Sequence, residues 1–99
     1  MPSTREYLNY VLECLRLYGR IKYRPMMGEF LLYQDGILFG GIYDDRLLIK
    51  KTSSNEQYDL SLEIPYTGAK PMYHIKDLDN GVLVQEIIHN AVKDLSSKK

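Results

Sequence analysis

The sequence predicts an α+β fold of two layers, with N- and C-terminal helices on one face of a mostly antiparallel sheet of about five strands. Three observations lead to this expectation. Each end of the chain has an amphipathic helical pattern, short apolar strands form a block between the ends, and an Asp-Gly pair joins two of these strands. Strands grouped in a block with helices outside it favour an antiparallel sheet. The 99 residues suffice for one hydrophobic core, so residues 1–99 are expected to form a single domain.

A first helix is expected over residues 3–18. Its apolar stripe recurs at helical spacing and consists of Leu8, Val11, Leu12 and Leu15. Ser3 and Glu6 have the spacing of a capping box and therefore predict the start of this helix. Gly19 follows the last periodic residue and predicts the end, because glycine tolerates the left-handed geometry of a helix stop.

Four strands are expected next, over residues 21–24, 29–34, 37–43 and 46–51. Asp35-Gly36 lies between the second and the third strand and fits a two-residue hairpin turn, because both residues adopt positive φ at low cost. Asp44-Asp45 marks the turn that follows. Gly40 and Gly41 inside a strand indicate a bulge or the close approach of another element.

The second half of the chain predicts a short helix, a strand and a long helix. Ser53 and Glu56 repeat the capping-box spacing, which favours a helix over residues 54–60. After a segment broken by prolines and a glycine, a strand is expected over residues 72–76. The last helix is expected to begin near Asp79, which can cap it. One face of this helix carries Val84, Ile88, Ala91 and Leu95.

The composition narrows the class of protein. Lys plus Arg and Asp plus Glu are both 13, so the net charge is zero, whereas a dedicated nucleic-acid binder is more often basic. A single cysteine excludes an intramolecular disulfide and fits the reducing cytoplasm. Neither a secretory signal nor an apolar run of the roughly 18 residues that span a bilayer is visible, so no membrane is expected as a partner. No Walker-type or dinucleotide-binding pattern occurs, and no cofactor is expected.

The stretch RPMMGEF is the most patterned part of the chain. Pro25 restricts Arg24 to extended geometry, and Gly28 permits a sharp change of chain direction. Met26 and Met27 can fill an irregular gap at such a bend. We interpret the stretch mainly as the link between two strands. The alternative is an adaptable methionine surface, flanked by Arg24 and Glu29, that meets a partner.

The same residues carry a family resemblance. STREYLNYVLECL, followed by YRPMMGEFLLYQDGILFGGIYDDRLLIKK and later by KPMYHI, resembles the N-terminal domain of the TfoX/Sxy family. That family has an Arg, then Met-Phe-Gly, a strand, Asp-Gly, an apolar strand and a DDRLYLK segment. The counterparts here are Arg24, Met26-Met27-Gly28, Asp35-Gly36 and residues 44–50. Pro25 stands where many relatives have a second basic residue, and Met27 replaces an aromatic one.

The resemblance implies a two-layer α+β domain similar to the secretion-chaperone architecture, with no known catalytic residues. It implies a regulatory or protein-interaction role, because members of the family include regulators of natural competence thought to assist transcription. Those regulators usually have a second, C-terminal domain, for which this chain has no room. We therefore expect a stand-alone, competence-regulator-like, cytoplasmic interaction domain.

Residues with catalytic or metal-binding chemistry are few. Cys14 could act as a nucleophile with His74 or His89, but no fixed-spacing partner or Gly-rich elbow accompanies it. Two histidines without nearby cysteines or paired carboxylates are a weak metal pattern. Asp44 and Asp45 are adjacent, as turn formers often are. We expect no enzyme activity and no metal.

A nucleic-acid-binding accessory protein is the alternative function. Arg16, Arg20, Lys22 and Arg24 could form a small basic patch with tyrosines nearby, as in proteins that bind single strands. A solvated sheet face, balanced by acids elsewhere, explains the same residues and is favoured by the zero net charge. Nucleic acid is therefore the less favoured partner.

Strand 37–43 is apolar on both sides, which predicts cover on both faces of the sheet. Simple alternation separates Leu38, Gly40 and Ile42 from Ile37, Phe39, Gly41 and Tyr43. One helical layer covers one face only. The other face is expected to meet a different protein, a second copy of the chain, or the segment between Thr52 and Met72. A homodimer is the simplest of these, because a symmetric interface uses one patch twice.

Overall fold

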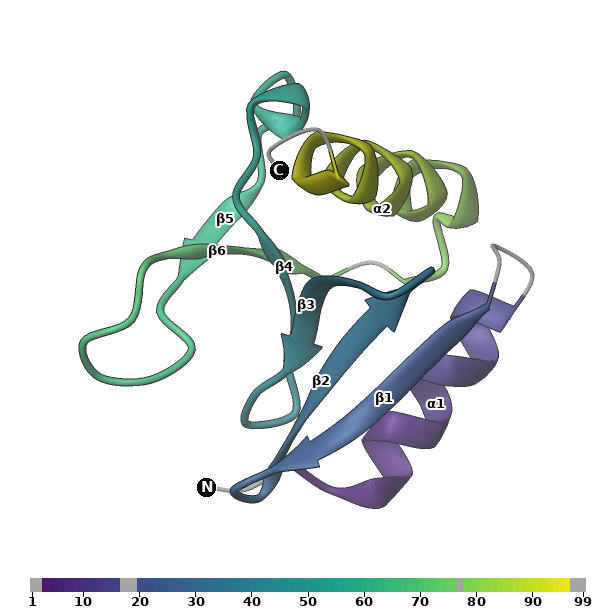
Figure 1. Ribbon diagram of the computed structural model, residues 1–99, viewed down its shortest axis with the longest axis vertical. Coiled ribbons are helices and arrows are strands. Elements are labelled where there is room, and N and C mark those ends of the chain that lie inside the picture. The colour runs from purple at the N-terminus through teal and green to yellow at the C-terminus, as the bar shows by residue number, and fades with distance from the viewer. Residues whose placement is uncertain (1–2, 17–19, 77, 97–99) are drawn as a thin grey trace.

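The computed structural model describes residues 3–16, 20–76 and 78–96. The elements in chain order are α1 (Arg5–Leu15), β1 (Ile21–Met26), β2 (Glu29–Gln34), β3 (Ile37–Ile42), β4 (Leu47–Lys50), the 3₁₀ turn η2 (Ser53–Asn55), β5 (Ser61–Glu63), β6 (Met72–Ile75) and α2 (Gly81–Ser96). They can be followed in Figure 1. No helix in the described ranges is long and apolar enough to cross a membrane.

The six strands form one antiparallel sheet in the order β1-β2-β3-β4-β6-β5. Both helices pack on the same face of this sheet, which confirms the α+β class predicted from the sequence. The expected number of about five strands is too low by one. The additional strand is β5, a three-residue strand that pairs with β6 at the edge of the sheet.

The main core lies between the sheet and the helices. Apolar residues of both helices meet those of the strands there, and the buried set comprises Leu8, Val11, Leu15, Leu32, Phe39, Ile42, Leu47, Ile49, Ile75, Leu78, Val84, Ile87, Ile88 and Ala91. Leu12 and Leu95 are partly buried at its margin. The two amphipathic stripes predicted from the sequence therefore face the core.

Three hairpin turns of two residues each join successive strands. Their residues all have positive φ: 51° and 86° at Met27-Gly28, 52° and 80° at Asp35-Gly36, and 53° at both Asp44 and Asp45. This pattern is typical of type I′ turns, whose twist matches that of the flanking strands. The bend expected at Gly28 and the turns expected at the two aspartate positions are confirmed. β1 extends to Met26, so the bend is tighter than the sequence suggested.

A bulge in β3 overturns the simple alternation expected for that strand. Leu32 pairs with Gly40 but Tyr33 pairs with Leu38, so Phe39 is an extra residue. Beyond such an insertion the side chains change faces. As a result Phe39 and Ile42, expected on opposite sides, share the main core. Gly40 is also closely approached by β4, since a Cβ built there would lie 3.0 Å from the Ile49 Cα.

The helix starts differ from those expected. Thr4, not Ser3, caps α1, because the Thr4 hydroxyl accepts a hydrogen bond from the Tyr7 N–H at 3.1 Å. At α2, Asn80 rather than Asp79 supplies the capping oxygen, which accepts from the Leu83 N–H at 3.4 Å. Tyr18 and Gly19, the expected end of the first helix, lie outside the described residues.

The helix expected over residues 54–60 is absent from this described segment and is replaced by η2 followed by β5. Tertiary hydrogen bonds account for the difference. The buried Asn55 amide donates to the Ile87 carbonyl of α2 at 2.9 Å, and the Ser54 N–H and hydroxyl donate to the Asp94 carboxylate at 3.0 and 2.8 Å. These bonds hold Ser54 and Asn55 against α2, and the chain then continues to β5.

Candidate functional site

The face of the sheet opposite the helices, here termed the open face, carries the candidate site. Strand parity and packing place on it Lys22, Arg24 and Met26 of β1, Leu31 and Tyr33 of β2, Leu38 of β3, Leu48 and Lys50 of β4, and Met72 of β6. Cover on this face comes in part from within the chain. The segment between β5 and β6 folds over the open face, so that Pro65 is buried and the Tyr66 ring lies 6.3 Å from the Tyr43 ring.

This cover forms a second, smaller core of Tyr43, Leu48 and Met72, with Leu31 packed against it. Burial raises the pKa of the Tyr43 hydroxyl above its ordinary value, and the neighbouring Tyr66 adds to the effect. The segment between Thr52 and Met72 was one of three candidates to cover the second face. It covers the β4–β6 half and leaves the β1–β3 half uncovered.

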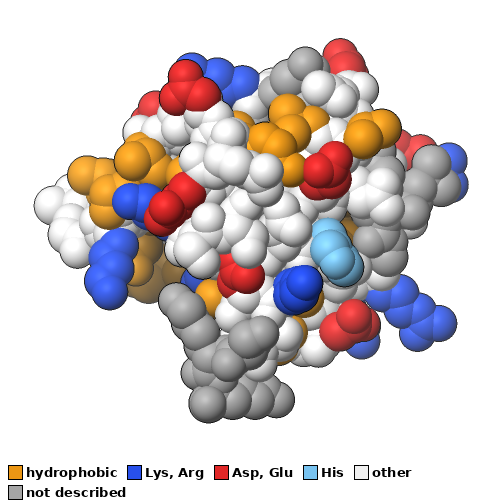
Figure 2. All heavy atoms as spheres, turned by 90° about the horizontal axis from the view of Figure 1, so that it is seen from above, with side chains coloured by type: hydrophobic (Ala, Val, Ile, Leu, Met, Phe, Trp, Pro, Cys, Tyr) orange, Lys and Arg blue, Asp and Glu red, His pale blue; other side chains and the backbone are white. Residues whose placement is uncertain are grey.

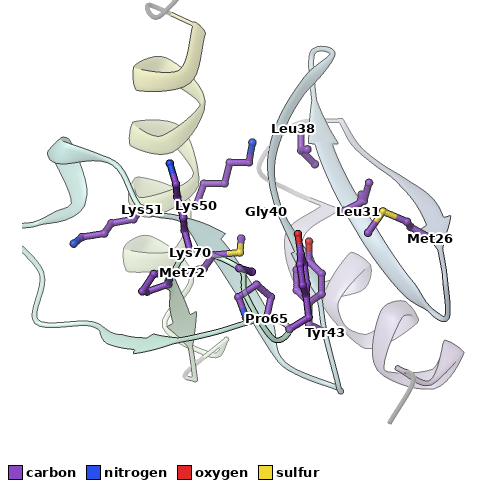
Figure 3. Close-up of a pocket in the computed structure, with 13 residues that line it drawn as sticks. Met26, Leu31, Leu38, Gly40, Tyr43, Lys50, Lys51, Pro65, Lys70 and Met72 are labelled. Atoms are coloured by element: carbon purple, nitrogen blue, oxygen red, sulfur yellow. The ribbon is translucent and has the colours of Figure 1, made fainter.

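A groove of about 730 Å³ remains between the two halves of the open face. It is lined by Met26, Leu31, Leu38, Gly40, Tyr43, Lys50, Lys51, Pro65, Tyr66, Ala69, Lys70, Pro71 and Met72. Figure 3 shows Met26, Leu31 and Leu38 on one wall and Lys50, Lys70 and Met72 on the other. Large apolar pockets with a few polar groups are the usual form of a binding site. We term this feature the open-face groove.

The groove exists because the sheet divides along the line between β3 and β4, termed the seam here. The two strands pair only at Gly40, Gly41 and Ile42, so residues 37–39 of β3 have no partner residue in β4. Beyond the bulge the two halves diverge. On the helical side α2 fills the resulting space, and Ile87 and Ile88 pack into the main core. On the open side the same divergence leaves the groove.

The charge at the groove is positive. Lys50, Lys51 and Lys70 line it, no acidic side chain is among its lining residues, and none of these lysines has an ion pair within the described chain. Lys22 and Arg24 stand beside it on β1 and are likewise unpaired among described residues. At the left of Figure 2, where the segment between β5 and β6 projects in Figure 1, hydrophobic and basic side chains lie next to each other, with an acidic side chain beside them. The net charge of the chain is zero, but the residues that line the groove include lysines and no acidic residue.

The residues of the RPMMGEF motif divide between two roles. Arg24 and Met26 point to the open face, and Met26 is a wall of the groove. The sequence predicted that Met27 fills a gap at the bend, and this prediction is wrong. Met27 lies at the tip of the turn and is 96% exposed. Gly28 provides the positive φ of the turn, and its carbonyl accepts from the Ser3 N–H at 3.0 Å.

Glu29 anchors the start of α1 to two hairpins. Its Oε1 accepts from the Ser3 hydroxyl at 2.6 Å, the Ser3 N–H at 3.0 Å and the Asp44 N–H at 3.2 Å. Beside it the Asp45 Oδ1 accepts from the Thr4 N–H at 2.8 Å and the Thr4 hydroxyl at 3.2 Å. We term Ser3, Thr4, Glu29 and Asp45 the N-terminal clasp. The geometry gives Glu29 a structural part and places it outside the groove.

The four residues of the expected basic patch do not form one surface. Arg16 belongs to the helical layer and pairs with Glu13 at 3.0 Å, whereas Lys22 and Arg24 lie on the open face. Arg20 is exposed just before β1. Sequence reasoning missed Lys50, Lys51 and Lys70, which join Lys22 and Arg24 around the groove. Their signal was weak, because the three lysines come from two separate segments of the sequence.

The candidate catalytic residues lie apart. Cys14 on α1 packs against the main core, His74 points to the open face beside Leu48, and His89 is exposed on α2. Cys14 and His74 are thus on opposite sides of the sheet. Asp44 and Asp45 occupy a turn. Over residues 3–16, 20–76 and 78–96, no group of three His, Cys, Asp or Glu side chains is placed to hold a metal ion.

We expect His74 to make stability depend on pH. Burial lowers its pKa, as do the nearby Lys76 and Arg46 cations to a smaller extent, while Glu63 opposes them. A histidine whose pKa is lower in the folded state contributes full stability above its unfolded pKa of 6.5 and loses it as the pH falls through the folded pKa. The melting temperature should therefore fall between about pH 7.5 and about pH 5.5, and less so for His74→Gln. Equal falls for both proteins would contradict this assignment.

Comparison with known proteins adds one relative. No protein-family model matches the chain. The chain is 30% identical over 80 residues to a protein of Spirochaeta aurantia whose printed name is "Uncharacterized 12.7 kDa protein in trpE 5′ region". The alignment spans 79% of this chain and 70% of that protein.

Proposed function

This chain belongs to the same family as the 12.7 kDa Spirochaeta aurantia protein, and we propose that it is a non-enzymatic, cytoplasmic protein-interaction domain. Its docking surface is the open-face groove. A regulatory role of the kind implied by the resemblance to the TfoX/Sxy N-terminal domain is part of this proposal. The single cysteine is compatible with a reducing compartment.

The observation that carries the proposal is an apolar groove left uncovered on the face opposite the helices. The Leu31 and Leu38 side chains are only half-buried there, and Met26 is 36% exposed. Contiguous apolar surface bordered by polar residues marks interaction sites in soluble proteins. Cys14, His74 and His89 lie apart and do not converge on the groove, which supports binding rather than catalysis.

The test compares a groove variant with a matched surface variant. Leu38→Gln removes apolar surface from the groove wall, whereas Val82→Gln makes the same kind of change on α2, where Val82 is 71% exposed. Crosslinked pull-downs from native lysate, quantified by mass spectrometry, should recover partner proteins about tenfold less with Leu38→Gln than with wild type or Val82→Gln. Circular dichroism confirms that both variants fold. Equal recovery by all three proteins, or none by wild type, would refute the proposal.

A nucleic-acid-binding accessory role is the second candidate. The observation in its favour is the group of cations on the open face, Lys22, Arg24, Lys50, Lys51 and Lys70, next to Tyr33 and Tyr66. Against it stand the apolar walls of the groove and the burial of Tyr43, whose ring cannot offer a free face for stacking. Sub-micromolar, salt-dependent binding of an oligonucleotide would favour this role over the first.

A further inference from the structure

Besides its side chains, the open-face groove contains a stretch of β3 backbone that has no neighbouring strand on one side. Along residues 37–39 the side of β3 that faces away from β2 has no strand beside it, because pairing with β4 begins only at Gly40. The groove runs past Leu38 and Gly40 at this position. An extended segment laid there would be adjacent to β3 and could extend its ladder. Addition of a strand to an unpaired edge is a recurring mode of peptide recognition.

The side chains around this position define the chemistry of such a segment. Leu31, Leu38 and Met72 offer apolar contacts, while Lys50 and Lys70 stand on the opposite wall (Figure 3). Arg24 adds a cation from β1. Because none of these cations has an ion pair within the described chain, carboxylates of an incoming segment would find unmatched partners. Complementary charge selects partners and speeds their encounter.

A second copy of the chain is the less favoured occupant. A two-fold interface would place the open face against itself, and the residues that line the groove include no acidic side chain to pair with Lys50, Lys51 and Lys70. The sheet edges are also protected. β1 carries Lys22, Arg24 and Pro25, and β5 has only three residues, features that oppose pairing between edges.

Resting on the function proposed above, we propose that the open-face groove binds an extended acidic segment of another protein. Its apolar side chains contact Leu31, Leu38 and Met72, its backbone lies beside β3, and its carboxylates pair with Lys50, Lys70 and Arg24. Part of the affinity is then electrostatic and decreases with salt, because the lysine side chains are solvent-accessible.

The test uses fluorescein-labelled peptides of about ten residues that differ in one property at a time. The first alternates Asp with Leu, the second has Lys in place of Asp, and the third has Ser in place of Leu. Fluorescence anisotropy with the full chain should show binding of the first peptide, at least about tenfold weaker binding of the other two, and weakening by salt. Equal or tighter binding of the lysine peptide would overturn the proposal.

Variants locate the binding. Lys70→Glu changes an exposed loop residue at the groove, and Lys93→Glu makes the same change of charge on α2, away from it. Binding of the acidic peptide should weaken about tenfold with the first variant and stay unchanged with the second. Light scattering should give the mass of a monomer. Equal effects of both variants, a stable dimer, or tighter binding of an oligo(dT) probe at physiological salt would each overturn the proposal.

The outcome is separable from that of the proposed function. If Leu38→Gln abolishes partner recovery while the peptides bind without regard to charge, the docking surface stands and the acidic-segment proposal is wrong. If Leu38→Gln leaves partner recovery unchanged, the proposed function itself fails.

Discussion

Replacing the buried Gly40 with valine is expected to destabilise the domain by about 3 kcal/mol, because the larger side chain would overpack the contact between β3 and β4. A Cβ at this position would overlap the Leu48 carbonyl oxygen and lie 3.0 Å from the Ile49 Cα and 3.2 Å from the Ile49 Cδ1. The first two obstacles are backbone atoms of β4, which cannot rotate away. β3 and β4 would have to separate at the seam, where they pair over only three residues.

The matched control is Gly68→Ala. Gly68 has a φ of +88°, but nothing lies within 4 Å of a Cβ built on it, so the substitution bears only the cost of left-handed backbone, about 1 kcal/mol. Urea unfolding followed by circular dichroism measures both changes. If Gly40→Val were no more destabilising than Gly68→Ala, close approach would not be the reason for glycine at position 40.

Glu29→Ala is expected to destabilise the domain by about 2 kcal/mol. The substitution removes the acceptor of three hydrogen bonds, two from Ser3 and one from the Asp44 N–H. The start of α1 would then be held to the β3–β4 hairpin by the bonds of Thr4 to Asp45 and by the Ser3 hydroxyl, which accepts from the Asp45 N–H at 3.1 Å and donates to the Ile42 carbonyl at 3.3 Å. Glu29→Gln keeps an acceptor oxygen without its charge, and because charge-assisted bonds are about twice as strong as neutral ones it should recover about half of the loss.

Glu13→Ala serves as the control for removal of a carboxylate. Glu13 pairs with Arg16 on an exposed helix face, with side-chain exposures of 71% and 64%, so its loss should change stability by less than about 0.5 kcal/mol. Thermal melts at one pH compare the three variants. Equal melting temperatures for Glu29→Ala and Glu13→Ala would show that the N-terminal clasp contributes little to the stability of the domain.

The sequence predicted those elements whose signal is local. The helices at both ends were predicted from apolar periodicity, and the hairpins at Asp35-Gly36 and Asp44-Asp45 from turn chemistry. Apolar periodicity and turn residues each determine local structure within a few residues, and tertiary contacts did not change these elements. The bulge was suggested by Gly40 and Gly41, but its consequence for the faces of β3 depended on pairing with β2.

The parts that sequence could not predict depend on residues distant in the chain. Ser53 and Glu56 have a capping spacing, yet the segment forms only η2, in which Ser54 and Asn55 bond to α2. Ser3 has the same spacing with Glu6, but its hydroxyl bonds to Glu29. The open-face groove joins Leu31 and Leu38 to Lys70 and Met72, more than thirty residues away. Local sequence patterns do not show which residues that are distant in the sequence line the same groove.

The seam has a mechanical consequence. Two three-stranded halves are joined by the pairs of Gly40, Gly41 and Ile42, and α2 contacts both β3 and β4 across the line where they diverge. Such a sheet bends more readily along this line than across either half. A segment wedged into the groove would open or close the angle between the halves, and α2, resting on the reverse side, would shift with it. Binding of a segment in the groove would thus change the position of α2 on the opposite face of the sheet, because only three residue pairs join β3 to β4.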